Sequence, residues 1–208
     1  MARFKQLGFY FDQTKCTGCK ACQVACKDKN QLPVGRTWRR VAEYTGGDWS
    51  HDTAEDTYTH HVWTYYTSVA CNHCEDAICM EVCPSTAMRR DENGIVYVDP
   101  SVCIGCRYCE MACPYSAPQP DADSGIMTKC DFCRDRINAG GTPACVAACP
   151  TRALDFGEIE DLRKRGGTAD VAPLPKPSVT KPRLVVKPHA KAQPSDSKTG
   201  ALVNSEEL

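Results

Sequence analysis

Cysteine is the residue type whose number and spacing indicate chemistry in this chain of 208 residues, which contains 16 of them. The clearest stretch is Cys103-Ile-Gly-Cys106-Arg-Tyr-Cys109-Glu-Met-Ala-Cys113-Pro114. In a run with this spacing, the first three thiolates hold one iron–sulfur cluster and the fourth ligates another cluster. Such a run therefore needs a partner run elsewhere in the chain.

Three further runs contain the remaining cysteines. The first run has Lys27 where proline would follow, the second has a middle gap two residues longer, and the fourth has eleven residues between Cys133 and Cys145. Their cysteines are Cys16, Cys19, Cys22 and Cys26; Cys71, Cys74, Cys79 and Cys83; and Cys130, Cys133, Cys145 and Cys149. Four runs of four use all 16 cysteines, which is the number of thiolates that four cubane 4Fe-4S clusters require.

The crossing rule, applied to the neighbouring second and third runs and to the first and last runs, predicts four ligand sets. Set 1 is Cys16, Cys19, Cys22 and Cys149; set 2 is Cys71, Cys74, Cys79 and Cys113; set 3 is Cys83, Cys103, Cys106 and Cys109; set 4 is Cys26, Cys130, Cys133 and Cys145. The pairing of the first run with the last is the less secure, because they lie far apart in sequence. Four one-electron carriers indicate an electron relay. No catalytic triad, glycine-rich phosphate loop or open metal site is visible, so we expect no catalysis by this chain alone.

Zinc and disulfides are the alternatives to iron–sulfur chemistry. Zinc also takes four thiolates, and the two separated pairs of the fourth run resemble a zinc ribbon. A three-cysteine run completed by a distant cysteine before proline is not a zinc pattern. Disulfides suit exported chains, but residues 1–12 lack the cationic and apolar segments of a secretory signal, and the spacings are those of metal ligands.

Charge and hydropathy exclude two classes of function. With 25 basic and 26 acidic residues the net charge is −1, which gives no electrostatic case for binding nucleic acid. No stretch approaches 18 consecutive apolar residues, so no membrane span is predicted and any membrane role must come through a partner.

Polar residues beside the cysteines have two interpretations. A positive charge near a cluster stabilises its reduced form and raises its potential, whereas a solvated loop charge does not. For each basic residue alone the solvated state is the favoured interpretation. His73 is expected beside the ligands or facing solvent rather than as a ligand. The basic residues are Lys15, Lys20, Lys27, Arg107, Lys129 and Arg134.

The segments around the runs predict an α+β fold. Residues 8–12 and 95–98 are typical of strands, residues 84–90 predict a short helix with proline in its first turn, and residues 150–156 repeat that helix and add a short strand. Residues 158–165 predict a further helix. This order is typical of bacterial ferredoxin domains. We predict tandem ferredoxin-like modules, one made of residues 1–35 with 127–170 and the other of residues 69–126.

Two segments lie outside these modules. Residues 36–68 contain no cysteine and predict a β-hairpin insertion with strands near 39–44 and 61–66. This insertion either forms a contact surface or covers cluster edges. Residues 171–208 are rich in proline and predict an extended, partly disordered tail. Residues 179–188 are predicted to lie along a partner subunit, and a solvated tail is the alternative.

Six motifs along the chain carry a resemblance to a known family. They are Tyr44-Thr-Gly-Gly-Asp-Trp49, Cys71-Asn-His-Cys74-Glu-Asp, Cys103-Ile-Gly-Cys106-Arg-Tyr-Cys109, Met127-Thr-Lys-Cys130-Asp, Arg152-Ala-Leu-Asp-Phe-Gly157 and Val171-Ala-Pro-Leu-Pro175. These motifs resemble those of the four-cluster electron-transfer subunits of molybdopterin oxidoreductases, and most closely the iron–sulfur B subunits of anaerobic dimethyl sulfoxide reductases. The resemblance runs nearly end to end, tail included.

The resemblance implies a heterotrimer for anaerobic respiration. A membrane anchor would oxidise menaquinol, this subunit would relay electrons, and a molybdopterin-containing catalytic subunit would reduce an S-oxide or N-oxide. It also implies export with the catalytic subunit, to the periplasmic face. In some relatives the second cysteine of the third run is replaced and the cluster has three irons, whereas Cys106 is present here. The alternatives are the beta subunit of a related molybdoenzyme (thiosulfate, polysulfide or tetrathionate reductase), a soluble polyferredoxin and a zinc-binding adaptor.

Overall fold

The computed structural model describes residues 6–207. Residues 1–5 and 208 lie outside the described residues. They include the start of the segment 1–12 that lacks a secretory signal pattern, the start of the predicted module that begins at residue 1, and the last residue of the predicted tail. The elements are β1 (Leu7–Asp12), α1 (Ala21–Lys29), β2 (Arg40–Gly46), β3 (Trp49–Asp52), β4 (Thr57–His60), β5 (Trp63–Val69), α2 (Ile78–Glu81), β6 (Met88–Arg90), β7 (Val96–Val98), α3 (Tyr108–Ala112), β8 (Gln119–Pro120), β9 (Met127–Thr128), α4 (Arg134–Asn138), α5 (Ala144–Ala147), β10 (Leu154–Glu158), α6 (Ile159–Lys164), β11 (Leu184–Lys187) and β12 (Gly200–Leu202), with 3-10 turns at Pro177–Val179 and Ser205–Glu207.

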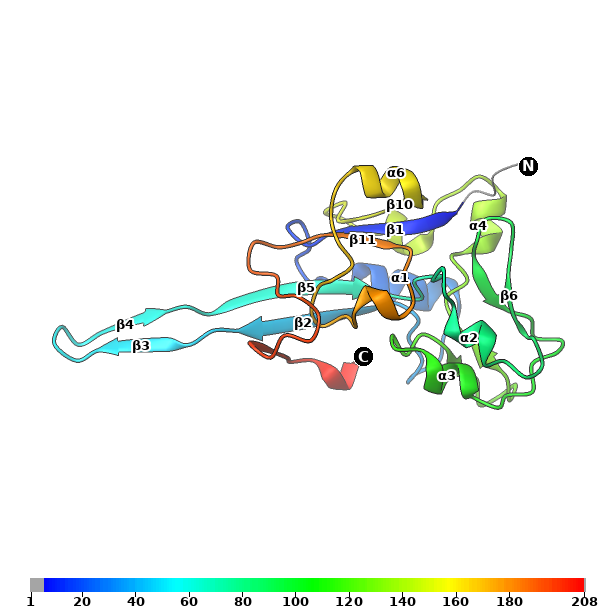
Figure 1. Cartoon of the computed structure of the whole chain (residues 1–208), viewed down its shortest axis with the longest axis horizontal. Coiled ribbons are helices and arrows are strands. Elements are labelled where there is room, and N and C mark those ends of the chain that lie inside the picture. The colour runs from blue at the N-terminus through cyan, green and yellow to red at the C-terminus, as the bar shows by residue number, and fades with distance from the viewer. Residues whose placement is uncertain (1–5, 208) are drawn as a thin grey trace.

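A three-stranded sheet in the order β10-β1-β11 forms the centre of the core. Its middle strand β1 is buried along its whole length, and the strand predicted for residues 8–12 is confirmed. Because side chains alternate across a strand, Phe9 and Phe11 belong to the large apolar cluster on one face, whereas Tyr10 packs with Ile159 and Leu162 of α6 on the other. The helix predicted for residues 158–165 is thus the cover of this sheet (Figure 1).

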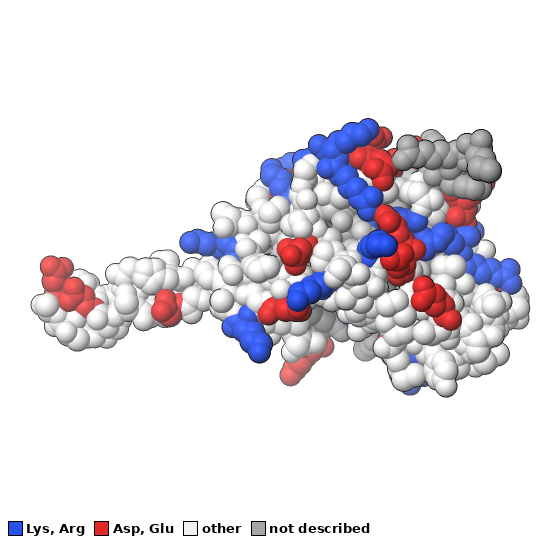
Figure 2. Space-filling view, viewed as in Figure 1, with Lys and Arg blue, Asp and Glu red and all other residues white. Residues whose placement is uncertain are grey.

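The insertion forms a long arm (Figure 1). Strands β2 and β5 pair antiparallel, and the segment between them forms a second hairpin from β3 and β4. The predicted hairpin is confirmed, and the segment between its two strands is also paired. Figure 2 shows acidic side chains at the far end of the arm, where every residue of β3 and β4 is exposed.

The helices predicted after Pro84 and Pro150 are wrong. In both places the third residue after the cysteine has a left-handed backbone, Thr86 with φ 53° and Arg152 with φ 53°. This conformation ends a helical turn, and the chain enters β6 or β10 instead. The cause is competition for the backbone N–H groups, because the N–H of Ala153 donates to the Cys149 thiol at 3.2 Å rather than to a helical carbonyl.

The first run shows the effect of the missing proline. Helix α1 continues past Cys26 and Lys27 and reaches nine residues. In the third run, α3 has five residues and ends before Cys113, which Pro114 follows. Proline restricts the preceding residue to extended backbone, and Cys113 has φ −80° and ψ 114°. Replacement of this proline by Lys27 therefore accounts for the longer helix.

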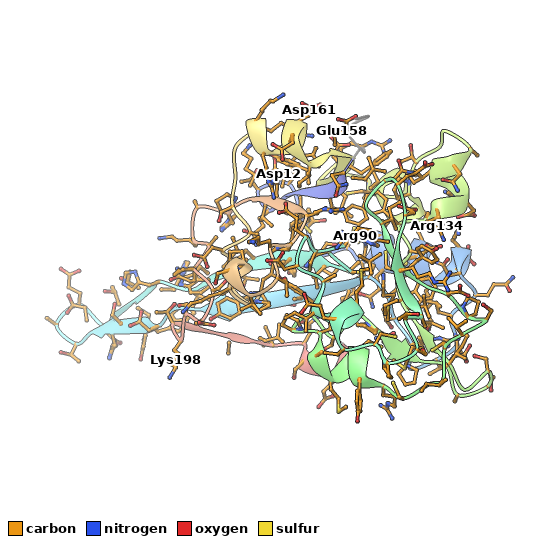
Figure 3. All side chains as sticks on the ribbon, turned by 45° about the vertical axis from the view of Figure 1, so that its right-hand side comes forward. Asp12, Arg90, Arg134, Glu158, Asp161 and Lys198 are labelled. Atoms are coloured by element: carbon orange, nitrogen blue, oxygen red, sulfur yellow. The ribbon has the colours of Figure 1, made fainter. Side chains whose placement is uncertain are left out.

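The prediction that residues 179–188 lie along a partner subunit is wrong. Strand β11 pairs in parallel with β1 of the same chain, and Val186 is fully buried at 0% exposure. The Lys187 ammonium lies 3.4 Å from the carboxylate of Asp12, which Figure 3 labels on β1. The end of the tail also adds β12 to the β2–β5 sheet. The tail is therefore more than a solvated extension, because its strands β11 and β12 complete both sheets.

Candidate iron–sulfur sites

Runs one and three bend their backbone in the same way. Gly18 and Lys20 have φ 70° and 58°, and Gly105 and Arg107 have φ 66° and 65°. The helices α1 and α3 begin at the next residue. A Cβ on Gly105 would lie 2.1 Å from the carbonyl oxygen of Gly125, so this position requires glycine. In each of these two runs the first three cysteines line the same cavity.

Three cavities each bring together the four cysteines of one predicted set. One cavity is lined by Cys16, Cys19, Cys22 and Cys149, a second by Cys71, Cys74, Cys79 and Cys113, and a third by Cys83, Cys103, Cys106 and Cys109. The thiols surround these cavities without converging on one point. Within residues 6–207, no three His, Cys, Asp or Glu side chains are close enough to hold a single metal ion.

The four cysteines of set 4 are all buried. Cys26 lies within electrostatic range of Cys133 and Cys145, and Cys130 within range of Cys26. Burial raises the pKa of Cys26 to about 12. The first and last runs, which supply sets 1 and 4, meet where α1 packs against α5. The structure thus brings together these distant runs, and their division into sets 1 and 4 stays a prediction.

The sets differ in burial and follow one another in space. Cys19 of set 1 and Cys106 of set 3 are exposed. Cys22 of set 1 lies near Cys145 of set 4, and Cys130 of set 4 lies near Cys71 of set 2. Set 2 adjoins set 3 because α2 carries Cys79, Cys83 is the second residue after this helix, and both cysteines pack against one apolar cluster. The neighbour order is therefore 1, 4, 2, 3, with exposed thiols at its two ends.

Hydrogen-bond donors lower the pKa of two thiols, Cys83 and Cys149, whereas burial raises the pKa of several others. Burial raises the pKa of Cys16 to about 11 and of Cys74 to about 12, so that both are protonated at neutral pH until a metal displaces the proton. For Cys83 and Cys149, burial acts in the same direction, but N–H and hydroxyl donors outweigh it and lower the pKa. These donors follow from the turn after each Cys-Pro pair.

Arg39 provides a test of whether an anionic group fits between sets 1 and 4. Its side chain is buried at 2% exposure, and Nη1 donates to Ser68 Oγ at 3.1 Å. Its Nε and Nη2 have no acceptor among the described residues. Burial lowers the pKa of Arg39, but the nearby Cys145 and Cys22 thiolates outweigh that effect and raise it. Buried donors need acceptors, and the sulfur atoms of clusters held by these thiolates would supply them. No spacing in the sequence signals this arginine.

Lys129 and His73 are buried, contrary to the solvated state favoured for the lysine and to the solvent-facing alternative for the histidine. Lys129 is 4% exposed and its Nζ donates to Cys71 Sγ at 3.3 Å, to the Cys130 carbonyl oxygen at 2.9 Å and to the Val96 carbonyl oxygen. His73 is 1% exposed, and Nε2 lies 3.9 Å from Cys130 Sγ. The histidine lies beside the cysteines, as the other alternative predicted.

Three of the other basic residues are exposed or form ion pairs. The exposed Arg107 forms an ion pair with Glu110 at 2.7 Å, and Lys15 is exposed. Arg134 on α4 forms an ion pair with Asp91 at 3.0 Å and lies over the Tyr97 ring at 3.7 Å. Figure 3 labels Arg134 at α4 and Arg90 at the neighbouring β6. The solvated interpretation therefore suits Lys15 and Arg107, whereas Arg134 joins the fourth run to the β6–β7 hairpin.

The base of the arm also lines a site. Val41 of β2 and Ser68 of β5 line the cavity of set 1, and Ser68 Oγ lies 3.4 Å from Cys22 Sγ. The covering role weighed for the insertion is therefore correct for its base. The contact role stays a prediction for the exposed hairpin of β3 and β4.

Two family models match this chain. Residues 62–159 match the 4Fe-4S dicluster domain and residues 7–28 match a 4Fe-4S binding domain. The chain thus has ferredoxin-type 4Fe-4S domains within a mixed α and β fold. None of the helices between residues 6 and 207 has the length and apolar character needed to cross a bilayer.

Curated relatives match nearly the whole chain. It is 52% identical over 204 residues to the B subunit of anaerobic dimethyl sulfoxide reductase from Escherichia coli, covering 98% of each. It is 50% identical over 205 residues to the subunit of that name in Haemophilus influenzae, covering 98% of this chain and 100% of the relative. The thiosulfate reductase electron transfer subunit of Salmonella typhi is 45% identical over 151 residues, covering 72% and 74%.

Proposed function

This protein belongs to the family of iron–sulfur B subunits of anaerobic dimethyl sulfoxide reductases, and from this membership we propose that it relays electrons through four 4Fe-4S clusters to a molybdopterin-containing catalytic subunit. It is a non-catalytic electron-transfer subunit of a multi-subunit reductase complex. The observation that carries the more specific proposal is the match to dimethyl sulfoxide reductase subunits over 98% of the sequence, whereas the thiosulfate reductase relative covers 72% of it.

Sets 1 to 4 are the proposed ligand sets. The support is the grouping of sets 1, 2 and 3 around separate cavities and the burial of all four cysteines of set 4. On this proposal, residues 1–35 with 127–170 form one ferredoxin-like module, with sets 1 and 4, and residues 69–126 form the other, with sets 2 and 3. The hairpin of β8 and β9 crosses the proposed boundary at residues 126 and 127.

When bound, a 4Fe-4S cluster accepts and releases one electron at a time. The chain's own residues hold, insulate and tune each site. Buried Arg39 places a positive charge beside sets 1 and 4, and Lys129 places one beside sets 2 and 4. Both charges favour the more reduced state of a neighbouring cluster. Backbone N–H groups donate to the thiolates of Cys83 and Cys149 in the same sense.

The proposed relay runs in the order 1, 4, 2, 3 or in reverse. Its ends are the sets with an exposed cysteine, where a partner can approach closely. Three apolar side chains within five positions of Cys106 in the chain, Ile104, Tyr108 and Met111, are 66%, 53% and 74% exposed, and exposed apolar side chains close together are typical of contact sites. One end faces the catalytic subunit, and the other faces a quinol-oxidising membrane anchor. The three subunits form a heterotrimer at the periplasmic face of the membrane.

Iron and acid-labile sulfide analysis of the purified complex tests the four clusters. About sixteen of each in this subunit, after subtraction of the catalytic subunit's own content, support the proposal. Electron paramagnetic resonance during stepwise reduction then resolves the separate clusters and their interactions. Zinc in place of iron, or only two clusters, overturns it in favour of the zinc adaptor or an ordinary ferredoxin.

A further inference from the structure

The backbone of Val96, in β7, forms hydrogen bonds with two side chains, His73 from the second cysteine run and Lys129 from beside the fourth. Its backbone N–H donates to His73 Nδ1 at 3.1 Å, and its carbonyl oxygen accepts a hydrogen bond from Lys129 Nζ. Val96 itself is buried at 1% exposure. One residue of one strand therefore fixes the position of both polar side chains in the interior.

The contact with Val96 also determines the tautomer of His73. Because Nδ1 accepts a hydrogen bond, the proton of the neutral ring is on Nε2. A ring whose Nδ1 accepts a hydrogen bond carries no proton on that atom, so the ring is neutral. Nε2 lies 3.9 Å from Cys130 Sγ, and the ring packs edge-on against Phe132 with 5.3 Å between centroids. The ring N–H is thereby a donor to the Cys130 sulfur.

Lys129 connects the fourth run to the second, because it donates to a cysteine of the second run. It precedes Cys130 in the chain, yet its ammonium donates to the sulfur of Cys71 at 3.3 Å. Its three acceptors are the Cys71 sulfur, the Cys130 carbonyl oxygen and the Val96 carbonyl oxygen, and they match the three N–H donors of a charged ammonium. A charged donor to a thiolate is a stronger hydrogen bond than a neutral one.

We propose that His73 and Lys129 form a crossed pair of hydrogen-bond donors between the two inner clusters of the relay. His73, from the run that supplies set 2, donates to Cys130 of set 4, and Lys129, from the run that supplies set 4, donates to Cys71 of set 2. This inference rests on the proposed function, which assigns Cys71 and Cys130 to different clusters.

The crossed pair has two consequences for electron transfer. Each donor stabilises the added electron on the opposite cluster, so each raises that cluster's potential. Since Lys129 is charged and His73 is neutral, the effect on set 2 is the larger. His73 also links the two sites through one hydrogen bond and its own backbone, because it stands between Cys71 and Cys74. Both side chains are positioning residues, since they act through the cysteines.

A potentiometric titration of the purified complex, followed by electron paramagnetic resonance, tests the proposal. Cys71→Ser and Cys130→Ser first identify the signals of sets 2 and 4. We expect Lys129→Met to lower the midpoint potential of the set 2 signal more than that of any other, and Lys129→Arg to restore part of the shift. His73→Leu lowers the set 4 potential, and His73→Gln restores part of it by keeping a side-chain N–H.

The outcome that overturns the crossed pair is a shift on the wrong cluster, or no shift with all clusters present. Iron content separates this failure from failure of the proposed function, because a wild-type complex with four clusters in this subunit leaves that function intact. Incorporation of 15N-histidine avoids any folding defect of a variant. A weak nitrogen coupling on the set 4 signal of the unmodified complex is expected, and its absence overturns the role of His73.

Discussion

Arg39 lies over the ring of Phe9, with its guanidinium carbon 4.6 Å from the ring centroid. Phe9 belongs to the central strand β1, and Arg39 directly precedes β2 of the arm, so this contact joins the two sheets of the protein. The surrounding thiols come from sets 1 and 4. A cation that is desolvated here contributes to the packing of the sheets and to the charge balance between two sites.

Replacement of Arg39 by leucine is expected to lower the midpoint potentials at sets 1 and 4 together. A hydrogen bond to a charged group is worth about 1.5–3 kcal/mol, which corresponds to a shift of about 65–130 mV for a one-electron carrier. Arg39→Lys retains the charge, so it should lower these midpoint potentials by a smaller amount. The matched control is Arg40→Leu, since Arg40 lies near Cys113 of set 2. A redox titration that shows equal shifts at all four signals would contradict this assignment.

Cys79 and Cys83 provide a test of the crossing between sets 2 and 3. They lie four positions apart in one run, but Cys79 lines the cavity of set 2 and Cys83 that of set 3. Cys83→Ser is therefore expected to alter only the signal that Cys106→Ser also alters. Cys79→Ser should alter the signal shared with Cys74→Ser. If both replacements change the same electron paramagnetic resonance signal, the crossing is wrong.

The apolar tail segment of β11 is expected to be essential for folding. Val186→Asp would bury a charge at a position with 0% exposure, and a change of this kind costs more than about 4 kcal/mol. The expected result is loss of soluble subunit and of bound iron. Val203→Asp is the control, since Val203 is 60% exposed. Normal yield and iron content in the Val186 variant would show that β11 is dispensable.

Local patterns in the sequence identify the cysteine groups and the strands around them. The spacing of each run, together with the crossing rule, predicts which thiols share a cavity in sets 1, 2 and 3, because three of the four lie in one run and the fourth comes from its partner run. The strand at β1 and the helix at α6 are correctly predicted from apolar patterning. The turns after Pro84 and Pro150 are not, because the hydrogen-bond acceptor that replaces a helical carbonyl is a cysteine sulfur.

The interior charges and the tail depend on contacts that no local pattern shows. Lys129 resembles any loop lysine until Cys71, 58 residues earlier, becomes its acceptor. Arg39 resembles a strand residue until it packs over Phe9. The short apolar group at β11 lies among prolines, and its partner strand is distant, as the 175-residue separation of Asp12 and Lys187 illustrates. Such pairings follow from the tertiary fold, so the sequence permits them without indicating them.

The thiols of the cluster sites make iron binding dependent on pH. In the metal-free fold, burial raises the pKa of Cys16 to about 11, above the usual thiol value of about 8.5. Protonation therefore stabilises the metal-free fold fully below about pH 8.5, and this stabilisation is lost as the pH rises through about 11. Since protons compete with iron for the same sulfur atoms, iron release to a chelator is expected to increase steadily as the pH falls from about 9 to about 5.

Replacement of Ser68 is expected to change the pH at which iron is released from set 1. Its hydroxyl lies 3.4 Å from Cys22 Sγ, and it opposes the rise in the Cys22 pKa that burial causes. Ser68→Ala is expected to move the midpoint of iron release to higher pH by less than about one unit, because one hydrogen bond contributes about 1 kcal/mol and one unit corresponds to about 1.4 kcal/mol. Ser50→Ala, on exposed β3, is the control. An unchanged release curve for Ser68→Ala, measured by iron content after chelator treatment at each pH, would show that this hydroxyl does not act on the Cys22 sulfur.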